Sequence, residues 1–99
     1  MSFKAQKNKR LRTAILGLLK TEYPDSLDIK ILRFSLDAIG YTLREADLSA
    51  HLRYLEEKGL IRQTTKKGYG FSISFVSLTA RGWDLLDGSI KEHGVDIDL

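Results

Sequence analysis

The sequence predicts one α+β domain in which three helices are followed by a two-stranded β-hairpin and a C-terminal helix. Apolar residues recur at helical spacing as far as Leu55, and after Gly59 they alternate with polar residues as in a strand. The chain has 99 residues, 42% of them hydrophobic, which suffices for one modest core. We expect a basic arm at residues 1–7, the domain at 8–90 and an acidic tail at 91–99.

The first helix is expected from about Asn8 to Tyr23, because Pro24 disfavours helical geometry in the residue before it. Its apolar side follows amphipathic spacing and consists of Leu11, Ile15, Leu18 and Leu19. Residues 1–20 also carry six cations and no acid. This end of the chain is therefore strongly basic.

The second helix is expected to begin after a cap at Asp25 or Ser26 and to end at Gly40. It is apolar on two nearly opposite sides: Ile29, Leu32, Leu36 and Ile39 form one, and Leu27, Ile31, Phe34 and Ala38 form the other. A helix that is apolar all round is buried on both sides. The second side should therefore lie either between the other two helices or against another subunit.

The third helix is expected over residues 42–58. Thr42 and Glu45 match the T-x-x-E capping box that starts a helix, and Gly59 supplies the left-handed residue that ends it. Between these ends, the helical spacing places three leucines on one side, namely Leu48, Leu52 and Leu55. We expect these leucines to anchor the helix in the core.

A hairpin is expected over residues 61–78, with a turn at residues 66–70. Phe71, Ile73 and Phe75 alternate with serines, and the phase changes at Val76, which predicts a β-bulge near residues 75–76. Thr79 is a suitable cap for the last helix. A glycine in its first turn, at position 82, would let that helix approach the sheet closely.

Several classes of function are excluded or disfavoured by composition. The chain has no cysteine, so it has neither disulfides nor thiolate ligands, and two distant histidines cannot form a metal site without several carboxylates. We expect no metal and no cofactor. The sequence contains no phosphate-binding loop or nucleophile motif, so we expect no enzymatic activity. No apolar run approaches the roughly 20 residues that span a bilayer, and we expect a soluble, cytoplasmic protein with no membrane partner.

Two motifs resemble known DNA-binding domains. The segment Ser49-x-His51-Leu52-x-x-Leu55-x-x-x-Gly59-Leu60-Ile61 resembles the end of the recognition helix and the start of the wing in ArsR-type, MarR-type and PadR-type bacterial regulators. Leu78-Thr79-Ala80-Arg81-Gly82 is similar to the L-T-x-x-G that opens the helix after their wing. The order of elements is that of a winged helix-turn-helix. The layout is also similar to small winged-helix proteins of Mu-like prophages.

The resemblance implies a transcriptional regulator that binds double-stranded DNA as a homodimer. The helix at residues 42–58 would enter the major groove, and the hairpin at 61–78 would follow the phosphate backbone. By position in the motifs, Ser49, Ala50 and Arg53 would face DNA, with Lys66 and Lys67 as wing contacts. Ala50 departs from the ArsR-type pattern, which usually has a long polar or basic residue there.

The charges leave a second function open. Residues 42–59 contain three cations but four acids, so this helix by itself attracts phosphate weakly. The helix itself offers Arg44 and Arg53 as cations for DNA binding. Further cations would be needed on the same surface, and the candidates from the rest of the chain are Lys7, Lys9, Arg10, Arg12, Arg62, Lys66 and Lys67. The alternative is a protein-protein interaction module that binds no DNA and docks through the second helix or the outer side of the third.

Overall fold

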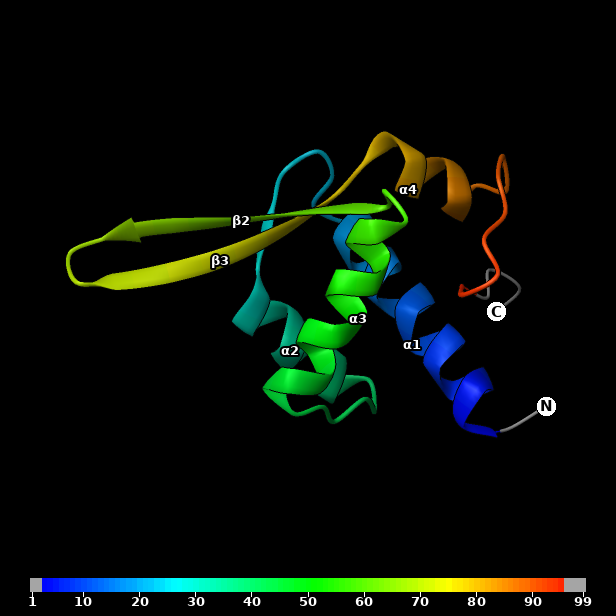
Figure 1. The fold of residues 1–99 in the computed structure, drawn as a ribbon, viewed down its shortest axis with the longest axis horizontal. Coiled ribbons are helices and arrows are strands. Elements are labelled where there is room, and N and C mark those ends of the chain that lie inside the picture. The colour runs from blue at the N-terminus through cyan, green and yellow to red at the C-terminus, as the bar shows by residue number, and fades with distance from the viewer. Residues whose placement is uncertain (1–2, 96–99) are drawn as a thin grey trace.

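The computed structural model describes residues 3–95. The elements follow in the order α1 (Phe3–Lys20), β1 (Leu27–Asp28), α2 (Ile29–Ala38), α3 (Glu45–Glu57), β2 (Ile61–Gly68), β3 (Phe71–Leu78) and α4 (Ala80–Leu86). In Figure 1 the hairpin β2–β3 extends away from the group formed by α1, α2 and α3, and α4 follows at its base. The predicted order of three helices, a hairpin and a fourth helix is confirmed.

The sheet has a third strand that the sequence did not reveal. Its order is β1-β3-β2, and β1 pairs antiparallel with β3 through Leu27↔Val76 and Asp28↔Phe75. Because this pairing keeps residues 27–28 extended, α2 starts after Asp28, whose side chain accepts a hydrogen bond from the Lys30 amide at 2.8 Å. The expected cap at residue 25 or 26 is therefore wrong.

The core is formed mainly by leucines from all three first helices. Leu48, Leu52 and Leu55 of α3 are at most 1% exposed, so their predicted role as an anchor is confirmed. From α1 the core receives Leu11, Ile15, Leu16 and Leu19, whereas Leu18 is only half-buried. No helix among residues 3–95 combines the length and apolarity needed to cross a membrane.

The second apolar side of α2 does not pack inside the fold. Leu32 and Leu36 are fully buried, but Ile31 and Phe34 are 53% and 76% exposed. Burial of this side between the other helices, one of the two alternatives for it, is therefore wrong. The fold uses one side of α2 and leaves the other in solvent.

The ends of α3 differ in how well they were predicted. At its start, Thr42 donates to Asp37 at 2.6 Å and does not cap the helix, so the expected box of Thr42 with Glu45 is wrong. Instead the Asp47 carboxylate accepts from the Arg44 amide at 3.3 Å. At its end, the Gly59 and Leu60 amides donate to carbonyls of the last turn, and Gly59 has φ +75°, which confirms the left-handed glycine.

The hairpin is regular along its whole length. Its register runs without interruption from Ile61↔Leu78 to Gly68↔Phe71, so the predicted bulge is wrong. The turn consists only of Tyr69 and Gly70, both with positive φ as in a type I′ turn, and residues 66–68 belong to β2. The change of phase in the sequence has another cause: β3 turns Val76 and Leu78 to the core, whereas its three alternating apolar residues, Phe71, Ile73 and Phe75, lie on the opposite face.

Parts of the expected arm and of the expected tail belong to the folded domain. Helix α1 begins at Phe3, so residues 3–7 of the expected arm are helical, and it ends at Lys20, before Tyr23. In the expected tail, Glu92 forms ion pairs with Lys58 and Arg81, and Val95 is 7% exposed. Residues 96–99 of that tail lie outside the described residues.

Gly82 provides a direct test of the close packing of α4 against Leu60 and Leu78. A Cβ atom at this position would lie 2.3 Å from the Leu60 carbonyl oxygen and 2.5 Å from a Leu78 methyl. We therefore expect Gly82→Ala to lower the free energy of unfolding by about 1–3 kcal/mol, the usual cost of overpacking. Gly17→Ala is the matched control, because this helical glycine has no atom within 4 Å of the added Cβ. That variant should raise stability by about 0.5–1 kcal/mol. Urea denaturation of both variants measures the difference, and equal effects would contradict the close approach of α4.

Candidate nucleic-acid interface

The outer side of α3 is a narrow, weakly charged surface. With Leu48, Leu52 and Leu55 turned to the core, the opposite side carries Ala46, Ser49, Ala50, Arg53 and Glu57, all exposed. Three of these, Ser49, Ala50 and Arg53, are residues that the sequence indicated as facing DNA. The structure leaves all three accessible on one side of one helix.

Most charges near α3 are already engaged within the protein. The Arg44 guanidinium donates to Asp47 at 3.1 and 3.2 Å, and this hydrogen bond holds the pKa of the Asp47 carboxyl below its usual value. Glu56 accepts from the Gln63 backbone amide at 2.9 Å, and Lys58 lies 3.8 Å from Glu92. Among the cations of residues 42–59, Arg53 is the one without a hydrogen bond or ion pair to any described residue.

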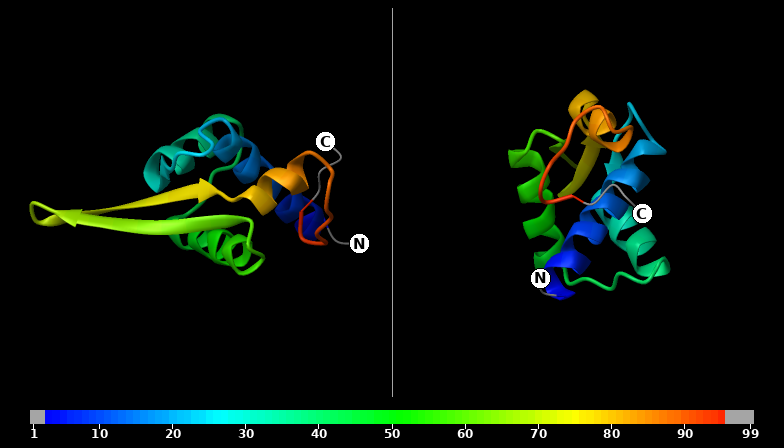
Figure 2. Two further views of the ribbon diagram at one scale, coloured as in Figure 1. Left: turned by 90° about the horizontal axis from the view of Figure 1, so that it is seen from above. Right: turned by 90° about the vertical axis from the view of Figure 1, so that its right-hand side faces the viewer.

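The hairpin borders α3 across an open groove of about 740 Å³. Ser49 lines the groove from α3, and Gln63, Ser72 and Ser74 line it from the hairpin. Viewed from above, α2 and α3 lie to either side of the hairpin (Figure 2). The hairpin face that carries Gln63 is thus turned toward the outer edge of α3.

The two wing lysines lie on opposite faces of the hairpin, because successive residues of a strand alternate. Lys67 is opposite Ser72 and therefore shares the hairpin face of Gln63, whose backbone amide donates to Glu56 of α3. Lys66 is opposite Ile73 on the other face, and its ammonium lies 5.3 Å from the centre of the Phe75 ring. Arg62 is on the same face as Lys66. Of these three cations, Lys67 alone shares the hairpin face of Gln63, and none of the three lines the groove itself.

Some basic residues of α1 line a groove beside α3, and others do not. A groove of about 340 Å³ between α1 and α3 is lined by Lys4 and Lys7 on one side and by Ala50 and His51 on the other. Lys9 is half-buried, and Arg10 is exposed without lining this groove. Lys4 was missed by sequence reasoning, although its three-residue spacing from Lys7 is a helical signal.

Arg12 was expected to contact DNA, but it links three parts of the fold. Its guanidinium carbon lies 4.0 Å from the centre of the Tyr54 ring. Its Nε donates to Nδ1 of His51 at 3.2 Å, and its Nη1 donates to the Gly94 carbonyl at 3.1 Å. These contacts join α1, α3 and the C-terminal segment, so Arg12 stabilises the position of α3 within the fold.

The basic clusters flank α3 and do not form one patch. In Figure 1 the start of α1 and the tip of the hairpin lie toward opposite ends of the longest dimension of the molecule, which is 46 Å, with α3 between them. An elongated, anionic partner laid across α3 could reach both. Among residues 3–95, no group of three or more histidine, aspartate or glutamate side chains could hold a metal ion.

Comparisons with known proteins identify the fold. Residues 13–86 match the family model of the ribonuclease R winged-helix domain. The structure is similar to that of the proposed transcriptional regulator TA0346 from Thermoplasma acidophilum, with a TM-score of 0.60 and 20% identity over 77% of this chain and 74% of that chain. It is also similar to Bacillus subtilis PadR in complex with operator DNA, with a TM-score of 0.62 and 21% identity.

That second match covers 90% of this chain and 53% of the PadR chain, so this chain spans about half the length of PadR. A search of curated protein sequences finds no match. Together, the family match and the two structural likenesses confirm the winged-helix fold that the sequence motifs indicated.

The contact between Arg12 and His51 predicts how stability changes with pH. Burial lowers the pKa of His51, and the Arg12 guanidinium lowers it further, against a smaller opposite effect of Asp47. The unfolded chain binds a proton at this histidine near pH 6.5, whereas the folded protein resists it. The free energy of unfolding should therefore fall as the pH drops below about 6.5, until the lowered pKa of the folded state is reached.

Denaturant melts between about pH 8 and pH 5 test this expectation. His51→Asn should remove part of the decline, because the side chain no longer titrates. His93→Asn, at an exposed position, is the control and should retain the full decline. If His51→Asn and wild type lose stability in parallel, the half-buried contact between Arg12 and His51 does not resist protonation.

Proposed function

Since the chain belongs to the family of ribonuclease R winged-helix domains, we propose that it is a cytoplasmic DNA-binding protein that regulates transcription as a homodimer. The likeness to PadR supports this, because that protein is seen in complex with operator DNA. In the proposed complex, α3 enters the major groove and the hairpin follows the phosphate backbone.

The observation that carries this proposal is the state of Arg53. Its guanidinium is exposed, has no partner among the described residues, and projects from a helix whose opposite side is fully buried. An α-helix fits the major groove, where an arginine can donate two hydrogen bonds to one guanine. Ser49 can donate to or accept from a base edge, and the Ala50 methyl can contact the methyl group of thymine.

The sequence-independent attraction would come from cations on both sides of α3. On the hairpin side this is Lys67, and on the other side these are Lys4 and Lys7 at the groove beside Ala50. Arg44 would add less, because Asp47 offsets its charge. Arg10, Arg12, Arg62 and Lys66 lie elsewhere or are engaged, so a smaller set of phosphate contacts is proposed than the sequence indicated.

The two wing lysines provide matched variants. Each neutralised phosphate contributes about 0.9 to the slope of log K against log salt concentration. Because each subunit of the proposed homodimer contributes one Lys67, Lys67→Ala should lower the magnitude of this slope by about 1.8, whereas Lys66→Ala should leave it nearly unchanged. Fluorescence anisotropy with a labelled DNA duplex at several salt concentrations measures both slopes. Equal losses from the two variants would contradict the assignment of the hairpin faces.

Arg53 provides the test for base reading. In a selection from random duplexes, wild type should enrich a motif, and Arg53→Ala should bind that motif about 5- to 150-fold more weakly, since a bidentate contact is worth about 1–3 kcal/mol. Lys91→Ala, at an exposed position after α4, is the control for loss of one charge. A variant that loses affinity equally for all duplexes would show that Arg53 contacts only phosphate.

Duplex RNA of the same sequence serves as competitor, because the family is named for a ribonuclease. The deep, narrow major groove of A-form RNA does not admit a helix, so RNA should compete much more weakly than DNA. If no DNA duplex binds even at low salt, the alternative of a protein-protein interaction module replaces this proposal.

A further inference from the structure

The exposed side of α2 is an apolar surface with no partner within the described residues. It consists of Ile31, Phe34 and Ala38, of which Phe34 is 76% exposed. Helix α2 is already anchored in the core by Leu32 and Leu36 on its other side. The exposed apolar side chains therefore add nothing to the packing of the core. Apolar surface that projects in this way from a small soluble domain usually marks an interaction site.

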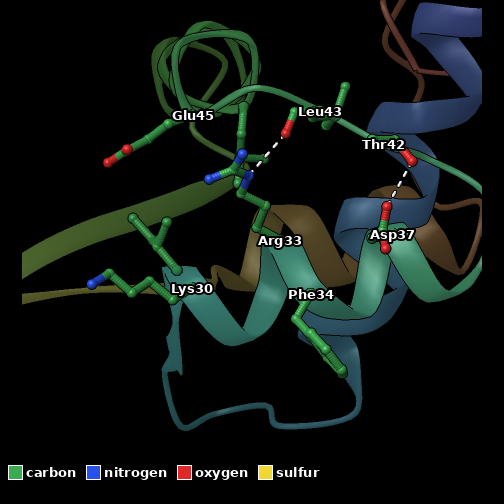
Figure 3. Close-up of a pocket in the computed structure, with 9 residues that line it drawn as sticks. Lys30, Arg33, Phe34, Asp37, Thr42, Leu43 and Glu45 are labelled. Atoms are coloured by element: carbon green, nitrogen blue, oxygen red, sulfur yellow. Dashed lines mark hydrogen bonds between the residues drawn. The ribbon is translucent and has the colours of Figure 1, made fainter.

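The charges beside this surface are arranged in a regular way. Lys30 and Asp37 are seven residues apart, so both lie on the same flank of Phe34, one near each end of α2. Ile31 and Ala38, also seven residues apart, lie on the other flank. Figure 3 shows Lys30 and Asp37 toward opposite ends of α2, with Phe34 between them and pointing away from α3.

We infer that this surface binds a second copy of the chain, with the two α2 helices antiparallel about a two-fold axis at Phe34. Such an axis brings each flank of α2 against its own copy, in reversed direction. Lys30, four positions before the centre, then meets the partner's Asp37, three positions after it. Ile31 meets the partner's Ala38 in the same way, and symmetry makes each contact twice.

Charge complementarity is the reason for choosing a second copy over an unrelated helix. A positive start and a negative end on one flank make the surface its own complement only in the antiparallel arrangement. Hydrogen bonds within the chain already engage part of the neighbouring polar groups. Arg33 donates its Nε–H to the Leu43 carbonyl at 2.8 Å, and Asp37 uses one oxygen to accept from Thr42, which leaves the other for the partner.

This inference rests on the homodimer in the proposed function and locates its interface. It uses none of the residues proposed to contact DNA, so the two can fail separately. Because α2 has ten residues and spans about 15 Å, the contact is smaller than the roughly 800 Å² per partner of a stable complex. We therefore expect a weak dimer that forms at high protein concentration.

Sedimentation equilibrium without DNA tests the apolar part. Wild type should show a concentration-dependent dimer, and Phe34→Glu should weaken it at least tenfold. Phe3→Glu is the matched control, because Phe3 is a 94% exposed phenylalanine on another helix, and it should dimerise as wild type does. A wild-type monomer at all concentrations, or equal effects of the two variants, would overturn the inference.

A charge exchange tests the antiparallel pairing itself. Lys30→Glu alone places two acids opposite each other, and Asp37→Lys alone places two lysines opposite each other, so each homodimer should be weakened. A mixture of the two variants should form a heterodimer close to wild type in affinity, because both of its pairs are again opposite in charge.

Fluorescence energy transfer between differently labelled variants measures this recovery. Asp37→Asn, which keeps an acceptor for Thr42, replaces Asp37→Lys if the latter fails to fold, and its mixture with Lys30→Glu should recover only part of the affinity. A mixture no tighter than either variant alone would refute the pairing. Salt-dependent DNA binding of the same variants reports separately on the proposed function.

Discussion

The arrangement of this domain depends on a crowded junction where α3 ends, the hairpin begins and returns, and α4 starts. The Leu60 carbonyl accepts from the Thr79 amide at 3.1 Å, and the Thr79 hydroxyl donates to the Gly59 carbonyl at 2.7 Å. The same hydroxyl accepts from the Gly82 amide at 3.1 Å. One threonine thus satisfies unpaired groups at the end of α3 and at the start of α4, which sets the direction of the hairpin relative to the outer side of α3.

The distribution of charge is the second determinant of what the domain can bind. Positive residues are numerous, but several stabilise the fold: Arg12 against Tyr54 and His51, Lys20 over the Trp83 ring, and Arg81 against the Lys58 carbonyl and Glu92. What remains free beside α3 is a small set on two sides. Net charge therefore overstates the attraction for phosphate, and the position of each cation decides its use.

Helix α2 is an unusual part of the domain because it is apolar on two sides and the fold buries one. A ten-residue helix buried on one side is adequately held by Leu32 and Leu36. On the other side, Phe34 remains exposed to solvent, which contributes nothing to the stability of a monomer. The opposite charges seven residues apart on its flank give this surface a direction as well as an apolar centre.

The sequence by itself determined the helix and strand types, the order of elements, the three leucines of α3 and the glycine-ended turns. These depend on local spacing and backbone conformation, which each segment carries within itself. It did not reveal β1, because a two-residue strand has no period. It also did not reveal the cap of α3 at residue 44. The regular register of the hairpin was missed because the core-facing side of β3 is defined only by what packs on it.

Which side chains lie on the candidate interface was likewise decided only by the tertiary structure. Neighbours in sequence such as Lys66 and Lys67 separate onto opposite faces of a strand, and Arg12 is drawn inward by Tyr54 and Gly94 from distant parts of the chain. A sequence states which charges exist, whereas contacts between segments far apart in the chain decide which of them remain free to meet a partner.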